Sequence, residues 1–134
     1  MVTPHTALIY TMVLMSAADG DMSDAELATI GEIVGTWPAF KGVDMTQLTT
    51  DAEACAGMLG ADDGLEAVLD TIAGALSGPL RETAYALACD VAAADLEADQ
   101  EELRLLEYLR YKLDLDRLVA AAIERAARAR HATL

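Results

Sequence analysis

Two short stretches of the sequence carry closely spaced carboxylates of the kind that bind cations. The first, AADGDMSDAEL, covers residues 17–27 and contains four acids, and the second, AADLEADQEEL, covers residues 93–103 and contains five. Five of the eleven positions are identical, and the second stretch lies 76 residues after the first. Carboxylate oxygens are the ligands that hard divalent cations such as Ca²⁺ and Mg²⁺ prefer.

Helix capping explains some of these carboxylates without any ion. Ser23 and Glu26 have the spacing of a capping box, in which each side chain bonds the backbone N–H of the other residue. Asp99 and Glu102 repeat this spacing in the second stretch, and each such cap contributes about 1 kcal/mol. Four acids have no capping role: Asp19, Asp21, Asp95 and Glu97. Their mutual repulsion has to be relieved by solvent or by a cation. An ion site and a purely structural role are both compatible with this pattern.

Neither stretch fits the loop of an EF-hand calcium site. The spacing of Asp19, Asp21 and Ser23 is similar to the start of such a loop, which requires Gly at its sixth position and a bidentate Glu at its twelfth. Asp24 and Ile30 occupy these two positions, and the second stretch fails at the same places. Zn²⁺ more often recruits His or Cys, but the two histidines lie near the chain ends. We therefore expect any bound ion to be Ca²⁺ or Mg²⁺ rather than Zn²⁺.

The sequence contains no recognisable pair of nucleophile and base. His5 and His131 lie near opposite ends of the chain, and no Ser or Cys has a catalytic signature around it. Cys55 and Cys89 lack CxxC spacing and lie in apolar helical surroundings, which predicts buried free thiols. We therefore expect a protein without enzymatic activity.

The composition predicts that helices position the acidic stretches, in an all-α fold. Hydrophobic residues make up 54% of the 134 residues, but aromatic residues only 4%, and Ala is abundant. Residues 5–18 are apolar on nearly every face, which is typical of a central helix that other helices surround. Three- and four-residue spacing predicts further helices, including one with the stripe Leu103, Leu106, Leu109 and Leu113. A chain of this length suits a single core and one domain.

Capping and breaking residues predict where the other helices begin and end. Thr50 and Glu53 have capping-box spacing, and Gly60 is placed to end the helix that follows. The predicted starts of later helices are Asp62 or Asp63, Pro79, and Asp114 or Asp116. Asp90, inside the helix that Pro79 begins, is expected to be exposed or bonded within its own helix, with a polar contact inside the core as the alternative.

The net charge of -14 is unevenly distributed along the chain. Residues 1–100 contain 17 acids and two bases, whereas residues 101–134 contain six acids and seven bases. The acidic part repels phosphate backbones and attracts cations and basic proteins, so nucleic-acid binding is not expected. The bases Arg125, Arg128 and Arg130 suit a helix C-terminus, with contact to an acidic partner or an anionic membrane as the alternative. The apolar segment 7–18 is too short to span a bilayer and follows no basic residues, which predicts a cytoplasmic protein.

The chain resembles the tellurite-resistance TerB-like family. The resemblance is carried by an apolar helix, AADGDMSDAEL, a second helix, and a later AAADLEADQEEL that LLEYLRYKLDLD follows. It implies a single compact domain over residues 1–134 with about seven helices. Within this domain, two related units of helix, acidic loop and helix are expected at about residues 5–35 and 79–113.

The same resemblance implies a non-enzymatic role in the response to tellurium oxyanions and other stresses. It transfers divalent-metal binding to Asp19, Asp21, Glu26, Asp95, Glu97 and Glu102. The expected function is therefore a module whose acidic face binds a divalent cation, a protein partner that is basic or membrane-associated, or both. Tellurite itself is an anion, which this surface repels. The alternative is a structural or protein-interaction domain whose acids only cap helices and keep it soluble.

Overall fold

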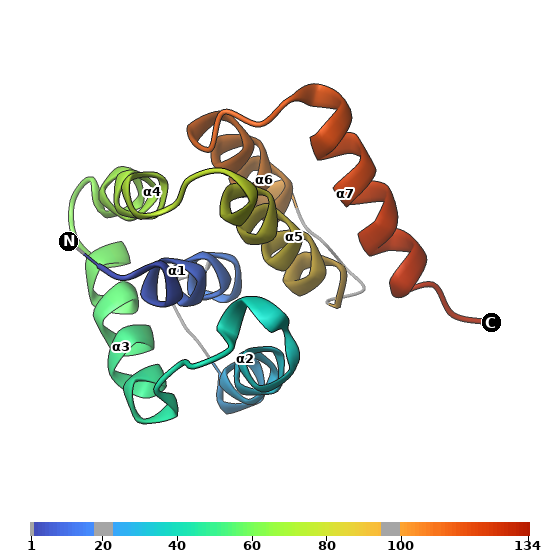
Figure 1. Cartoon of the computed structure of the whole chain (residues 1–134). Helices are drawn as coiled ribbons and strands as arrows, with labels where there is room; N and C mark the ends of the chain where they lie inside the picture. Colours follow the sequence, from blue (N-terminus) through green and yellow to red (C-terminus); the bar gives the residue numbers. More distant parts are fainter. Residues whose placement is uncertain (1, 18–22, 95–99) are drawn as a thin grey trace.

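Helix α1 (Pro4–Ser16) lies at the centre of the fold, as its apolar sequence predicts. Residues 7–15 are buried without interruption, so every face of the helix contacts other parts of the chain. Helices α2, α3, α4 and α5 pack around it (Figure 1). Because a helix without a polar face is stable only inside such a ring, α1 determines how the neighbouring helices are arranged.

The computed structural model describes residues 2–17, 23–94 and 100–134. This part of the chain forms a single compact domain of seven α-helices with no strand, which confirms the all-α prediction. After α1 come α2 (Asp24–Thr36), the 3-10 helices η1 (Pro38–Phe40) and η2 (Met45–Gln47), α3 (Leu48–Leu59), α4 (Gly64–Ala75), α5 (Pro79–Ala94), α6 (Gln100–Lys112) and α7 (Arg117–Arg130). The predicted relation between the two helix pairs α1–α2 and α5–α6 stays a prediction.

Several helix boundaries follow the predicted capping chemistry. The Ser23 hydroxyl accepts a bond of 3.1 Å from the Glu26 amide, and the Glu26 carboxylate accepts one of 3.0 Å from the Ser23 amide. The Asp116 carboxylate accepts bonds from two amides in the first turn of α7, as a cap does. Pro79 is the first residue of α5, and Gly60 follows the last residue of α3.

Two predicted caps are wrong. Thr50 lies inside α3 rather than before it, because η2 leads directly into that helix and moves its start forward to Leu48. Asp63 occupies the position before α4, but its backbone has a φ of 58° and its side chain caps nothing. The predicted cap at Asp99 lies outside the described residues.

Arg81 joins the ends of two helices to the start of a third. Its Nε donates to the Leu76 carbonyl at 2.9 Å, Nη2 to the Ala73 carbonyl at 2.8 Å and Nη1 to the Leu113 carbonyl at 3.0 Å. The last carbonyls of a helix have no partner within the helix. A guanidinium stabilises them because it can donate several hydrogen bonds at once. Arg81 thereby fixes the start of α5 against the ends of α4 and α6.

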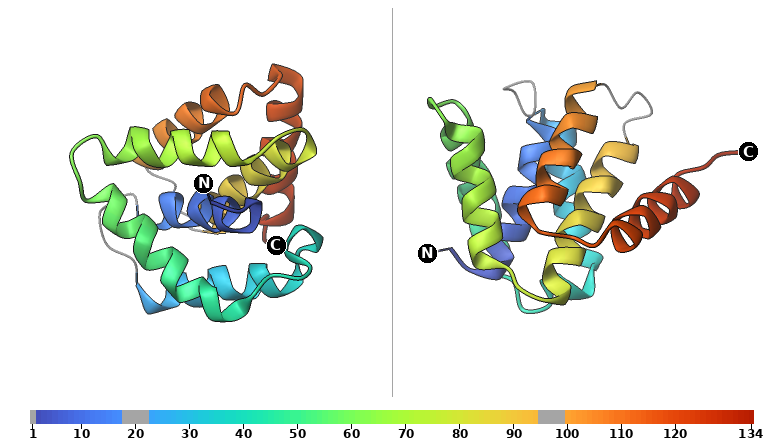
Figure 2. Two further views of the ribbon diagram at one scale, coloured as in Figure 1. Left: turned by 60° about the vertical axis from the view of Figure 1, so that its left-hand side comes forward. Right: turned by 90° about the horizontal axis from the view of Figure 1, so that it is seen from above.

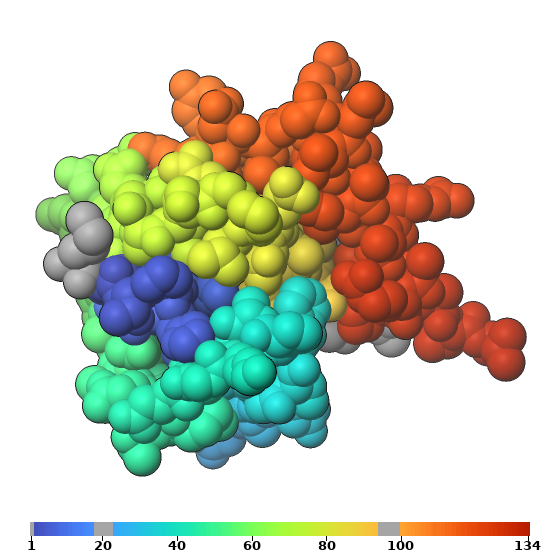
Figure 3. Space-filling model, in the orientation of Figure 1, coloured from blue at the N-terminus to red at the C-terminus, as the bar shows by residue number. Residues whose placement is uncertain are grey.

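Helix α7 packs mainly against α5 and forms a separate ridge along one side of the molecule (Figure 3). The side chain of Asp90 in α5 is only 12% exposed and pairs with Arg130 of α7, while His131 Nε2 lies 3.8 Å from Asp90 Oδ1. The expectation of an exposed or self-bonded carboxylate is therefore wrong, because α7 crosses α5 and covers this position. Of the described helices, none is both long and apolar enough to cross a membrane.

The close turn between α3 and α4 depends on Gly64. A Cβ atom at Gly64 would lie 1.9 Å from the Met58 carbonyl oxygen, whereas a Cβ at Gly74, in the same helix, would meet nothing within 4 Å. Gly64→Ala is expected to lower the free energy of unfolding by about 1–3 kcal/mol through overpacking. Gly74→Ala is expected to raise it by about 0.5–1 kcal/mol, because Ala restricts the unfolded chain more than Gly does. Urea unfolding followed by circular dichroism measures both effects, and changes of the same sign would contradict the close approach.

Candidate functional site

Four helix ends that flank the two acidic stretches lie at one end of the molecule. In the right-hand view of Figure 2, α1 and α5 end there, and α2 and α6 begin there. This arrangement follows from the packing of α1 beside α5, the most extensive pairing in the fold. The sequence could not provide this information, because the spacing along the chain does not determine how the two helix pairs meet.

Two of the six predicted metal ligands lie in the described residues. Glu26 is half-buried in the first turn of α2, where its carboxylate bonds the Ser23 amide. Glu102 is half-buried in the first turn of α6. A carboxylate at this position is stabilised by the positive end of the helix dipole. Glu26 therefore has the geometry of a capping-box residue at the start of α2.

The other four predicted ligands, Asp19, Asp21, Asp95 and Glu97, lie outside the described residues. Within residues 2–17, 23–94 and 100–134, no three side chains of His, Cys, Asp or Glu come together in a way that could hold a metal ion. The metal-binding prediction therefore depends on the acids of the two stretches and stays a prediction.

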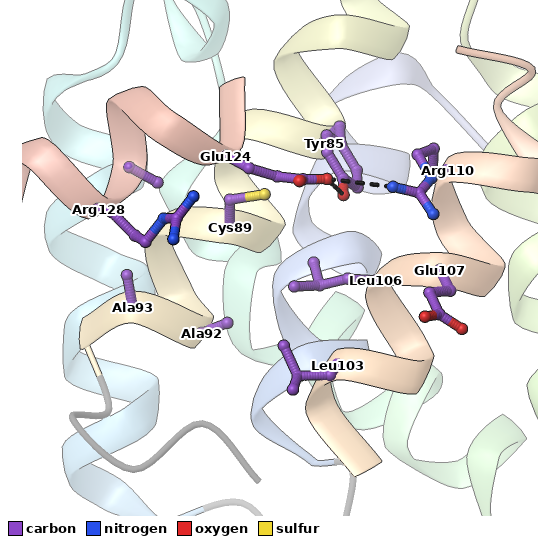
Figure 4. A pocket seen from close by; sticks show the side chains of 11 residues that line it. Tyr85, Cys89, Ala92, Ala93, Leu103, Leu106, Glu107, Arg110, Glu124 and Arg128 are labelled. Atoms are coloured by element: carbon purple, nitrogen blue, oxygen red, sulfur yellow. Dashed lines mark hydrogen bonds and ion pairs between the residues drawn. The ribbon is translucent and has the colours of Figure 1, made fainter. Parts of the chain in front are cut away.

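A second feature, which the sequence analysis missed, is a cavity of about 440 Å³ bounded by α5, α6 and α7 (Figure 4). At one end of this cavity the Tyr85 hydroxyl donates to the Glu124 carboxylate at 2.5 Å, and Arg110 Nη1 lies 3.3 Å from the same oxygen. Burial and the bond to Glu124 raise the pKa of Tyr85 above its usual value. Tyr85 therefore stays protonated and acts as a donor that orients Glu124.

The leucine stripe of α6 contained a signal for this cavity. Leu109 and Leu113 are fully buried, as predicted, whereas Leu103 is 51% exposed and Leu106 is only partly buried. Figure 4 shows Leu103 and Leu106 at the cavity, facing the space between α6 and α7. An apolar stripe that continues beyond the core indicates a surface available for binding. Sequence periodicity alone does not distinguish leucines buried in the core from leucines on such a surface.

The two cysteines are free and buried, as predicted. Burial raises the pKa of the Cys55 thiol to about 12, and burial together with the nearby Glu124 carboxylate raises that of Cys89 to about 12. A thiol is a nucleophile or a metal ligand only as the thiolate, so neither cysteine is prepared for such chemistry near neutral pH.

These features define a class of small all-α domain, with acidic stretches at helix ends and a partly apolar cavity between helices. The family model described as "Tellurite resistance protein TerB" matches residues 5–131. The chain therefore belongs to the TerB family, which confirms the resemblance seen in the sequence. A search of the curated proteins and a search of the solved structures found no match.

Thiol burial predicts a specific pH dependence. Unfolded cysteine ionises near pH 8.5, whereas the folded pKa of both thiols is about 12. The contribution of the thiols to stability is therefore complete below about pH 8 and decreases as the pH rises further. At about pH 8, Ellman's reagent should react slowly with the native protein and rapidly in guanidinium chloride. Cys89→Ala assigns the rate of each thiol, and rapid reaction of the native protein would disprove the burial of a protonated thiol.

Proposed function

We propose that this chain is a non-enzymatic tellurite-resistance module of the cytoplasm whose acidic end binds a divalent cation. The membership of the TerB family supports the general role. The ligands in this proposal are Asp19, Asp21, Glu26, Asp95, Glu97 and Glu102. A basic or membrane-associated protein partner is the second element of the proposal, and it binds the same end directly or through the cation.

The observation that carries the proposal is the placement of the four flanking helix ends at one end of the molecule (Figure 2). The first stretch connects α1 to α2, and the second connects α5 to α6. Both stretches must therefore start and finish at this end. Carboxylates from two such segments repel each other, and a divalent cation between them removes that cost.

The charge of the chain favours a cation over an oxyanion. The net charge is -14, and 17 of the 23 acids precede residue 101. A field of this sign raises the local concentration of cations and lowers that of tellurite. The protein therefore acts in tellurite resistance without binding the oxyanion at its acidic end.

The available ligands favour Ca²⁺ or Mg²⁺ over Zn²⁺. The His5 ring stacks on Phe40 with centroids 6.1 Å apart, and His131 lies beside Asp90. Both cysteines are buried and protonated. The acidic stretches contain no His or Cys and offer mainly carboxylate oxygens, which hard cations prefer.

Calorimetric titration of the full chain with Ca²⁺, Mg²⁺, Mn²⁺ and Zn²⁺ tests this proposal. Binding of Ca²⁺ or Mg²⁺ should release or absorb heat and raise the melting temperature, because a ligand that binds only the folded state stabilises it. Asp19→Asn with Asp21→Asn should weaken the binding at least about tenfold, since each change removes a negative ligand oxygen. Asp95→Asn with Glu97→Gln should have an effect of the same direction.

The matched control is Asp62→Asn with Asp63→Asn. These exposed acids lie in the turn between α3 and α4, at the same end of the molecule but outside the two acidic stretches, so the control removes the same charge without changing a proposed ligand. Asn also tolerates the positive φ of Asp63. An equal loss of cation affinity in the control would show that the general negative charge, and not the proposed ligands, attracts the cation. The absence of heat and of a melting shift at millimolar ion would exclude the cation and leave the purely structural or protein-interaction alternative.

A further inference from the structure

We propose that the space between α6 and α7 is a docking groove for an acidic amphipathic helix of a partner protein. This surface begins beside the acidic end, where Ala93 and Leu103 begin and end the second acidic stretch, and continues away from that end along α7. It does not depend on cation binding. The cavity of about 440 Å³ adjoins a second one of about 690 Å³, since Arg110 and Glu124 line both. Together they follow α7 from Arg117 to Arg128, which are eleven residues apart.

The two walls of the groove are each one face of a helix. On α6 the lining positions are 103, 106, 107 and 110, and on α7 they include 117, 121, 124 and 128. Residues at such spacings of three, four and seven lie on the same side of an α-helix. Ala92 and Ala93 of α5 line the groove between the walls (Figure 4). Two rows of side chains with small residues of α5 between them can receive the side chains of a third helix.

The groove leaves apolar surface exposed to solvent. Leu103 on the α6 wall is 51% exposed, and Leu118 on the α7 wall is 80% exposed. Burial of these leucines against a partner removes apolar surface from water and therefore favours binding. An amphipathic helix with apolar residues at spacings of three and four would cover both.

The charged side chains of the groove favour an acidic partner helix. The five charged side chains of the groove are Arg110, Arg117, Arg128, Glu107 and Glu124. Arg110 is already paired with Glu124, whereas Arg117 and Arg128 have no ion pair or side-chain hydrogen bond with any described residue. In a chain of net charge -14 this local excess of bases is unusual. Eleven residues of α-helix span about 16 Å, so two acids eleven positions apart on a helix would match the two arginines.

A designed peptide of about 18 residues tests the groove on the full chain. It carries Leu at spacings of three and four and Glu at two positions eleven residues apart, and its control replaces both Glu by Lys. Fluorescence anisotropy should show saturable binding of the Glu peptide and at least about tenfold weaker binding of the Lys peptide. Arg128→Glu should weaken the Glu peptide about tenfold, whereas Lys41→Glu, an equal change of charge at an exposed position outside the groove, should change it less than about twofold.

A second pair of variants separates docking from general electrostatics. Ala121 lines the groove and Ala122 does not, although both are exposed. Ala121→Trp should block the peptide, and Ala122→Trp should leave binding unchanged. Circular dichroism confirms that both variants fold. Equal affinity of the two peptides, equal effects within either pair of variants, or no binding at about 1 mM would overturn the proposal. A dimer in sedimentation that Ala121→Trp abolishes would also overturn it and identify a second copy as the occupant.

Discussion

The complete burial of α1 is the constraint on which the rest of the structure depends. Residues 7–15 leave no face for solvent, so the chain has to surround this helix with α2, α3, α4 and α5. Each large apolar side chain that becomes fully buried contributes about 1.5–3 kcal/mol. The single polar side chain of this stretch that is fully buried, Thr11, bonds the Ala7 carbonyl at 2.9 Å and therefore carries no unpaired group into the core.

Packing around α1 also explains the position of the helix ends that flank the acidic stretches. Helix α5 is rich in Ala, which lets it approach α1 closely, and the two helices end at the same end of the molecule. Helices α2 and α6 begin at this end as well.

The sequence predicted the parts of the fold that depend on local chemistry. The capping box of Ser23 and Glu26, the Asp116 cap and the central helix are all consequences of neighbouring residues, and the structure contains them. The position of Asp90 beside Arg130 depends on how α7 crosses α5, which periodicity does not encode. The exposure of Leu103 also depends on how the helices pack. An apolar stripe has the same sequence pattern whether or not another helix of the chain covers it.

The groove between α6 and α7 follows from the residues that attach each helix. Lys112 of α6 pairs with Glu66 at 2.5 Å and with Asp70, which ties α6 to α4. The fully buried side chains of α7 are the small ones of Ala120 and Ala127, which let the helix lie close to α5. Its polar contacts from Glu124 to Tyr85 and from Arg130 to Asp90 also reach back to α5, while Arg110 of α6 pairs with the same Glu124. Because α6 is held toward α4 and α7 toward α5, space remains between them on both sides of the Arg110–Glu124 ion pair, which joins the two helices.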